Sequence, residues 1–426
     1  MYSDNCSAPR KSLLGFDGDG NEMKRRVVVT GLGIVSCIGN GLDAVADALR
    51  DSCSGIRHVP EYAELGLASQ VAGIPDLGGE PAIPRKLRRF MADAGVYAWH
   101  AMRKAIDDAG ISPAEIRDPR TALIVGSGVG SPFRHDEALT IFRQWGLEKL
   151  LPYYVPQVMG STTSGNLVQA FGVGGPSYSI TAACASSAHC IGNGYQMIRH
   201  GIVDRAFVGG AEEVCWTSTV LFDAMGALST RRNDDPKTAS RPFDRDRDGF
   251  VIAGGAAVLL LEGEDVARRR GARIYGEIAG YGAASDSTDM VQPNADGVAR
   301  AMRAALAEAG QPAVDYINPH ATSTQSGDAA ELDSIRTVFG ESIPAVSATK
   351  GLTGHSIAAI SAQEAIFCLL MMRDGFVAAS ANLETPDEGY EAWPIVRQTT
   401  VQPVDTALSA SIGFGGTNAV LIFRNV

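Results

Sequence analysis

The chain alternates short apolar, β-branched runs with longer stretches in which apolar side chains recur at helical spacing. This alternation is typical of a layered α/β protein. The segments 90–110 and 184–201 predict helices in the first part of the chain, and each ends at a glycine. We expect strands around them at 26–30, 121–125, 178–182, 205–208 and 256–262.

After the charged segment 262–273 the pattern begins again, with helices expected at 297–310 and 355–372. In each half a strand enters a turn of small residues, and a reactive residue opens a buried helix: Cys184 in the first half, His355 in the second. We therefore expect a duplicated unit that brings both turns to one crevice. The strands of this second half are expected at 274–280, 315–318, 345–348, 407–411 and 419–424.

Length and charge narrow the possible functions. A chain of 426 residues fits two domains or one large duplicated one. The net charge of −11 argues against nucleic acid as the main ligand, although a local basic patch can serve an acidic partner. The seven cysteines are scattered and lack CxxC spacing, which indicates reduced thiols in a cytosolic protein, without a disulfide framework or a zinc site.

No segment predicts a membrane span. The most apolar long run, 355–372, contains Ser356, Ser361, Gln363 and Glu364, so a buried core helix is expected there. Residues 1–22 lack the apolar core of a signal peptide and are too acidic for a transit peptide. We interpret them as a flexible extension or a mis-assigned start, with the fold beginning at Met23.

Two ligand motifs are matched only in part. Gly31 and Gly33 follow a strand, but Ser36 occupies the third glycine position of a dinucleotide fingerprint. The segment from Asp244 imitates a calcium loop, yet its twelfth position is Gly255 instead of a bidentate Glu. A glycine-rich strand end and a salt-bridged structural loop are the better interpretations.

Cys184 is the candidate nucleophile. Small residues at a strand-to-helix corner form a tight elbow that exposes the side chain, and the helix start favours a thiolate. A helix end supplies roughly 1 kcal/mol, about 0.7 pKa unit, which leaves most of the thiol protonated near neutral pH. Nearby imidazoles should therefore contribute, and the candidates are His320 and His355, whereas His189 is expected to serve packing.

Together, "AACASS", "HATST", "KGLTGHS" and "GFGGTNA" resemble the active-site segments of the β-ketoacyl-acyl carrier protein synthases. "EEVCW", "FDAMGALST" and "RDGFVIAGG" are most similar to the bacterial type I enzymes, and the resemblance spans about 23–426. It implies an α/β protein with the thiolase fold: two βαβαβαββ halves, 23–271 and 272–426, stacked as α-β-α-β-α. It also implies an acyltransferase that elongates fatty acyl chains by decarboxylative Claisen condensation with malonyl-acyl carrier protein.

By this resemblance Cys184 accepts the acyl chain as a thioester, while His320 and His355 promote loss of CO2 from the malonyl group. Two neutral imidazole N–H donors suit the resulting enolate, and such preorganised donors contribute roughly 3–4 kcal/mol each. Lys350 belongs to the same set, and Glu331 is its expected ionic partner.

The remaining site residues also come from the resemblance. The backbone N–H groups of Cys184 and Phe414 form the oxyanion hole, and Phe414 gates the nucleophile. Thr322 and Thr324 bind the phosphopantetheine arm. Ile412 lines the acyl site, and Met159 reaches the pocket of a partner subunit.

The resemblance implies no metal or nucleotide cofactor, a cytoplasmic homodimer, and acyl carrier protein as the partner. Because carrier protein is acidic, a basic dock is expected at Arg85, Lys86, Arg88 and Arg89, although a solvated helix face is the alternative interpretation.

Three departures from the type I pattern leave alternatives open. Trp145 and Glu148 replace basic residues, Ala321 replaces a glycine, and Ile412 replaces a phenylalanine. A specialised condensing enzyme of a secondary lipid or polyketide pathway therefore remains an alternative. A non-catalytic subunit resembling a chain-length factor is disfavoured, because such subunits usually lack the nucleophile. Acyl chain length and the native carrier stay open.

Overall fold

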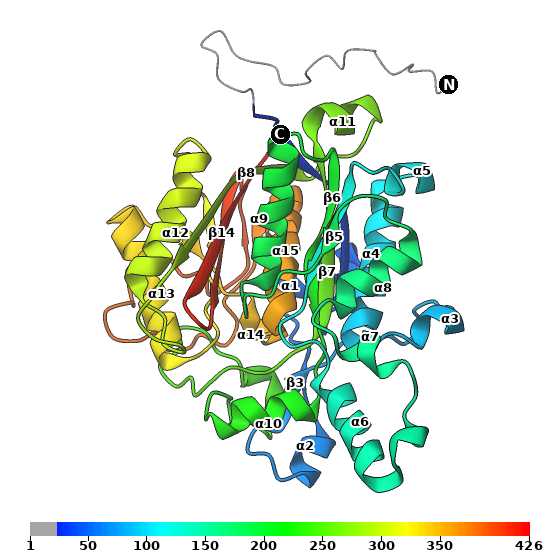
Figure 1. Ribbon diagram of the computed structural model, residues 1–426. Coiled ribbons are helices and arrows are strands. Elements are labelled where there is room, and N and C mark those ends of the chain that lie inside the picture. The colour runs from blue at the N-terminus through cyan, green and yellow to red at the C-terminus, as the bar shows by residue number, and fades with distance from the viewer. Residues whose placement is uncertain (1–23) are drawn as a thin grey trace, which may run out of the picture.

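A ten-stranded mixed sheet runs through the computed structural model, which describes residues 24–426 (Figure 1). The expected extension 1–22 lies outside the described residues. The strand order is β10-β9-β13-β14-β8-β1-β7-β6-β4-β5. At its centre β1 meets β8 only through the pairs Val28–Glu277 and Val29–Gly276, so the sheet divides there into two sets of five strands.

The two sets have the same internal topology. From the junction outward, one runs β1-β7-β6-β4-β5 and the other β8-β14-β13-β9-β10. In each, the first two pairings are antiparallel and the next two are parallel. The predicted duplication is confirmed. The first set comprises β1 (Val27–Val35), β4 (Thr121–Gly126), β5 (Ser177–Tyr178), β6 (Arg205–Glu212) and β7 (Gly255–Gly263), and the second comprises β8 (Gly276–Ser285), β9 (Tyr316–Asn318), β10 (Ala345–Val346), β13 (Thr406–Gly413) and β14 (Thr417–Arg424).

Helices fill the layers around and between these two halves. In Figure 1, α9 (Ser186–Arg199) and α15 (Ile360–Asp374) lie between the halves, and they contact strands of both. Outside the first half lie α4 (Asp93–Ala109) and α8 (Thr162–Phe171). Outside the second half lies α12 (Ala295–Glu308), with α13 (Gln325–Phe339) packed against it. This is the α-β-α-β-α layering implied by the thiolase fold.

Glycines allow the outer helices to approach the sheet closely. A Cβ atom on Gly31 or Gly33 of β1 would collide with backbone carbonyl groups of α4. Gly280 and Gly282 of β8 have the same relation to α12. The glycine-rich segment that partly matched a dinucleotide fingerprint therefore serves helix–sheet packing, and its recurrence is a second mark of the duplication.

The central helix α15 corresponds to the apolar run expected to be buried. All of its residues from Ile360 to Met372 are buried. Its polar side chains have partners: the Ser361 hydroxyl donates to the Cys184 carbonyl at 2.9 Å, and the Gln363 amide donates to the Val35 carbonyl at 3.0 Å. Within residues 24–426 no helix has the length and apolar character needed to cross a membrane.

Smaller elements complete the described chain. The helices are α1 (Leu42–Arg50), α2 (Pro60–Glu64), α3 (Arg85–Arg88), α5 (Pro113–Ile116), α6 (Pro132–Trp145), α7 (Tyr154–Val158), α10 (Trp216–Ala224), α11 (Glu264–Arg269) and α14 (Lys350–Thr353), with short 3-10 turns η1 (Leu147–Lys149), η2 (Pro236–Thr238) and η3 (Ile357–Ala359). Two small sheets pair β2 (Ile56–His58) with β3 (Val71–Gly73) and β11 (Phe376–Val377) with β12 (Thr400–Val401).

The loop that imitates a calcium site is held by internal pairing. Asp244 accepts hydrogen bonds from the Arg241 guanidinium at 2.9 Å and from the backbone N–H groups of Glu384 and Thr385. Arg247 pairs with Asp387 at 2.6 Å. This is the salt-bridged structural loop expected from the sequence.

Candidate active site

Cys184 stands at a tight corner between β5 and α9. The strand is shorter than expected, ending at Tyr178, and Ala183 adopts a left-handed φ of 47° just before the cysteine. The Ser186 hydroxyl fixes the corner by accepting the Ala182 N–H at 2.8 Å and donating to the Ala183 carbonyl at 2.6 Å. The corner therefore turns the thiol out of the strand direction, as in other nucleophile elbows.

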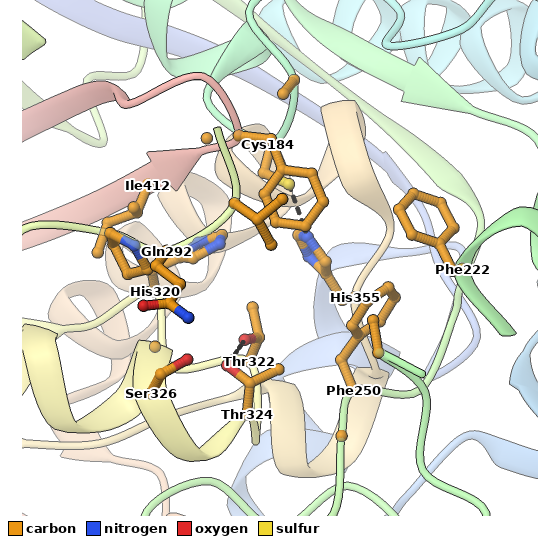
Figure 2. Close-up of a pocket in the computed structure, with 18 of the residues that line it drawn as sticks. Cys184, Phe222, Phe250, Gln292, His320, Thr322, Thr324, Ser326, His355 and Ile412 are labelled. Atoms are coloured by element: carbon orange, nitrogen blue, oxygen red, sulfur yellow. Dashed lines mark hydrogen bonds between the residues drawn. The ribbon is translucent and has the colours of Figure 1, made fainter. Parts of the chain in front are cut away.

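Two histidines from the second half meet this thiol (Figure 2). His355 lies between α14 and η3, and its Nε2 is 3.0 Å from the Cys184 Sγ. His320 follows β9, and its ring centroid is 5.1 Å from that of His355 at an interplanar angle of 85°. One ligand atom from each of the three residues lies within 4.8 Å of the others. The structure thus brings together three residues that are far apart in the sequence.

Burial controls the protonation of this cluster. It lowers the pKa of His320 and His355 well below the ordinary value, and the neighbouring Lys350 charge acts in the same direction. Both imidazoles are therefore uncharged near neutral pH. Burial also raises the pKa of Cys184 to about 12, against the opposing effects of Lys350 and of the backbone N–H groups of Phe414 and Cys184. The resting thiol is protonated, and Nε2 of His355 is the imidazole atom in contact with it.

Lys350 pairs with Glu364 of α15. Its Nζ lies 2.6 Å from the Glu364 Oε1, and both side chains are buried. The predicted pairing of Lys350 with Glu331 is therefore wrong. The sequence contained a signal for the correct partner, because Glu364 is the only acid in the apolar run 355–372 and a buried carboxylate requires compensation.

Glu331 organises the site through the backbone instead. Its two carboxylate oxygens accept the N–H groups of His320 at 2.6 Å and Ala321 at 2.7 Å. Burial raises the pKa of Glu331 to about 7 even though these amides act in the opposite direction. Glu331 thus fixes the segment that carries His320.

A cavity of about 830 Å³ opens above the cluster. Cys184, His320 and His355 lie in its wall. Figure 2 shows Phe222 and Phe250 near His355, and the hydroxyls of Thr322 and Thr324 across from Cys184. The chamber therefore combines a thiol, two uncharged imidazoles, apolar rings and a polar wall. This arrangement suits a long, partly apolar acyl substrate.

Comparison with known proteins agrees with this site. The model of the β-ketoacyl synthase N-terminal domain matches residues 24–267, and that of the C-terminal domain matches residues 275–384. The chain belongs to the β-ketoacyl synthase family. Among its relatives, 3-oxoacyl-[acyl-carrier-protein] synthase 1 of Haemophilus influenzae is 47% identical over 402 residues, covering 94% of this chain and 99% of the relative.

Solved β-ketoacyl synthases share the fold. A β-ketoacyl synthase from Burkholderia phymatum STM815 superposes with a TM-score of 0.90 at 35% identity, covering 94% of this chain and all of that one. A type II polyketide ketosynthase in complex with its acyl carrier protein has a TM-score of 0.87 at 29% identity, covering 95% of this chain and all of that one.

Other predicted residues of this β-ketoacyl synthase line the same cavity. The Thr322 and Thr324 hydroxyls lie 3.1 Å apart in its wall. Phe414 also lines it, while Ile412 is buried at 8% exposure. Met159 directly follows α7 and is not among the residues of the described chain that line this cavity. Its expected role in a partner subunit's pocket stays a prediction.

The predicted docking residues lie beside a second cavity of about 520 Å³. Arg85, Arg88 and Arg89 line it together with Arg134 of α6, and the Arg89 guanidinium lies 5.1 Å from the ring centroid of Tyr153. Lys86 is exposed on the same short helix α3. The structure therefore gathers four arginines at one surface of a chain that is acidic overall.

The cysteine and two histidines are also close enough together to hold a metal ion. The rest of the donor set does not fit a resident metal well. Ligating histidines normally donate their second ring N–H to an acceptor, but the Nδ1 atoms of His320 and His355 have no hydrogen-bond partner in residues 24–426. The Lys350 ammonium nearby also opposes a cation.

We expect Lys350→Met to destabilise the fold by about 3–5 kcal/mol, because the Glu364 carboxylate would remain buried without its cation. The matched control is Lys350→Met combined with Glu364→Gln, which removes both charges and should recover most of the loss. Denaturant unfolding measures both variants. A single variant as stable as the wild type would contradict the assignment of this ion pair.

Proposed function

We propose that the chain is a 3-oxoacyl-[acyl-carrier-protein] synthase that elongates fatty acyl chains. One observation carries the proposal: the Cys184 thiol contacts an uncharged imidazole, with a second uncharged imidazole beside it, in a chamber of acyl size. The relative from Haemophilus influenzae bears this activity in its name.

In the first half-reaction Cys184 takes the acyl group. His355 Nε2 accepts the thiol proton as the sulfur attacks the thioester carbonyl of acyl-carrier protein. The backbone N–H groups of Cys184 and Phe414 donate to the oxyanion that forms. When this intermediate collapses, the bond to the pantetheine sulfur breaks, and the carrier leaves as a thiol with the proton returned from His355.

In the second half-reaction the malonyl thioester loses CO2. The carbon–carboxylate bond breaks, and its electron pair forms an enolate. The enolate oxygen accepts hydrogen bonds from the ring N–H groups of His320 and His355, the latter now in the tautomer protonated at Nε2. The enolate carbon then attacks the acyl–Cys184 carbonyl and expels the sulfur as a thiolate, which takes up one proton from solvent. Because loss of CO2 leaves the electron pair of the broken bond on the carbon that becomes the nucleophile, the proposal requires no metal, nucleotide or redox cofactor. Substrates arrive on the pantetheine arm, for which Thr322 and Thr324 provide hydroxyls.

A specialised condensing enzyme is the second candidate. It is favoured by Ile412, which lines the cavity where type I enzymes have a phenylalanine, and by the structural similarity to a polyketide ketosynthase. Condensation assays of the purified enzyme against several carriers and graded acyl lengths distinguish the two. Turnover with ordinary fatty acyl carrier protein across the usual lengths supports the housekeeping function. Turnover confined to another carrier or a narrow acyl class supports the specialised one, and turnover only with a second subunit supports a non-catalytic role.

The proposed partner is an acidic acyl carrier protein that docks at the arginines of the second cavity. Arg85→Glu is expected to raise KM for carrier-borne substrates about 10-fold with little change in kcat, because opposite charges steer and hold the complex. The matched control is Arg397→Glu, an exposed arginine on another part of the surface. Steady-state kinetics at two salt concentrations measure the effect. An equal KM change in both variants would contradict this dock.

We also propose that the protein forms a homodimer. We further propose that it works in a reducing, cytoplasmic compartment. Two neighbouring helices, α6 and α7, bury no side chain, and Phe142, Trp145 and Val155 on them are exposed at 50%, 62% and 73%. Exposed apolar groups of this size support a protein interface. All six cysteines in residues 24–426 are free thiols, which supports the compartment. Sedimentation equilibrium tests the dimer.

A further inference from the structure

Glu212 is a buried carboxylate with no part in the reaction described above. It ends β6 and is 1% exposed. Its hydrogen-bond partners within residues 24–426 are one hydroxyl and two backbone amides, with no cation among them. Acidic side chains are rarely buried without a charged partner, so the burial of Glu212 requires an explanation.

The carboxylate joins segments from both halves of the fold. Its Oε1 accepts the Ser127 hydroxyl at 3.0 Å, and its Oε2 accepts the Gly128 N–H at 2.7 Å. These two residues follow β4. The same Oε2 lies 3.4 Å from the N–H of Ala358, which belongs to η3 just after His355.

Both anchored segments form part of the reaction chamber. Gly128 and Ile357 line the cavity together with Cys184. Ile357 has a φ of 45°, which is unfavourable for a β-branched residue and must be held by its surroundings. The Ser127 carbonyl also accepts the Thr181 hydroxyl at 2.8 Å, three residues before the nucleophile. Glu212 therefore bonds directly to the segment after His355 and, through Ser127, to the cysteine corner.

The charge of this carboxylate also reaches the thiol. When ionised, Glu212 raises the pKa of Cys184, against the effect of Lys350. Burial raises the pKa of Glu212 itself to about 7, and Glu213, the next residue after the strand, acts in the same direction. Three groups that can carry charge are coupled to Glu212. Glu213 and Cys184 are coupled to it directly, and Lys350 is coupled to it because it also acts on the Cys184 thiol.

We infer that Glu212 is a positioning residue for the nucleophile: it fastens the loop after β4 and the segment after His355 to the end of β6. Its charge adds to the effect of burial, which raises the pKa of the Cys184 thiol. This inference deepens the proposed function, since it concerns the same cysteine. It is nevertheless tested without carrier protein or malonyl thioester.

The test is the pH profile of Cys184 alkylation by iodoacetamide, measured on the tryptic peptide by mass spectrometry. Glu212→Gln retains an acceptor oxygen for the two amides and removes the charge. We expect its profile to move to lower pH by about half a unit, with alkylation about threefold faster at pH 8 and an unchanged Tm. Glu212→Ala loses both functions and should lower Tm and kcat for condensation, the latter about 10-fold.

Glu213→Gln is the matched control. Glu213 is also buried, but its carboxylate accepts the Ser131 hydroxyl and the Phe133 N–H at the start of α6. Its alkylation profile should stay that of the wild type. An unchanged profile for Glu212→Gln, or an equal shift for Glu213→Gln, would overturn the inference. Absence of condensation by the wild-type enzyme, together with a shifted Glu212→Gln profile, would refute the proposed function and leave this inference standing.

Discussion

Replacing Cys184 by alanine is expected to abolish condensation, lowering kcat at least 10⁴-fold, because no other group can carry the acyl chain between the two half-reactions. Formation of 3-oxoacyl product from acyl- and malonyl-carrier protein is the measurement. The thermal stability of the variant should stay close to that of the wild type, since the one side-chain hydrogen bond of the thiol within residues 24–426 is to His355.

Cys190 supplies the matched control for this change. It lies on α9, six residues beyond the nucleophile, and is also buried, but its Sγ faces the Ile180 carbonyl at 3.9 Å, away from the two histidines. Cys190→Ala should retain activity within a few-fold. If both variants lost activity equally, packing of α9 and not thiol chemistry would explain the result.

Replacing His320 by alanine is expected to lower condensation about 10²–10³-fold, the usual cost of removing one donor to a developing oxyanion. Acyl loading of Cys184 should change far less, because the imidazole in contact with the thiol is His355. Rapid-quench measurement of acyl-enzyme formation, alongside CO2 release from malonyl-carrier protein, separates the two steps.

His355→Ala should differ by slowing both steps, since His355 contacts the thiol and also faces His320. His189→Ala is the control: this histidine bonds to the Tyr281 hydroxyl at 2.6 Å, outside the cluster, and serves packing as expected from the sequence. Equal loss of loading in the His320 and His355 variants would contradict the division of roles drawn here.

Much of the architecture was predictable because the apolar spacing within single helices agrees with the repeat of the whole strand–turn–helix unit. The helices α4 and α12 have regular apolar spacing and glycines after their last turns; α4 lies within its expected segment, and α12 begins two residues before its own. The convergence of Cys184 and His355 followed from the repeated strand–turn–helix pattern, because equivalent corners of a duplicated unit meet at its pseudo-symmetric centre.

Other features depended on contacts that no sequence pattern encodes. The prediction that Lys350 pairs with Glu331 was wrong. Glu331 and Glu364 are both buried, and only the packing of α15 decides which carboxylate reaches the ammonium. The strand expected to reach Ala182 ends at Tyr178, because the chain must turn to place the cysteine. Helix α6 was missed because it buries no side chain, so its apolar residues show no core-facing stripe.

Residue-resolved mass spectrometry of the wild-type enzyme after incubation with acyl-carrier protein tests the central claim most directly. The account predicts that the intact protein gains one acyl group in thioester linkage, and that peptide mapping places it on Cys184. Acylation of another residue, or loading of Cys184→Ala at the wild-type rate, would contradict it.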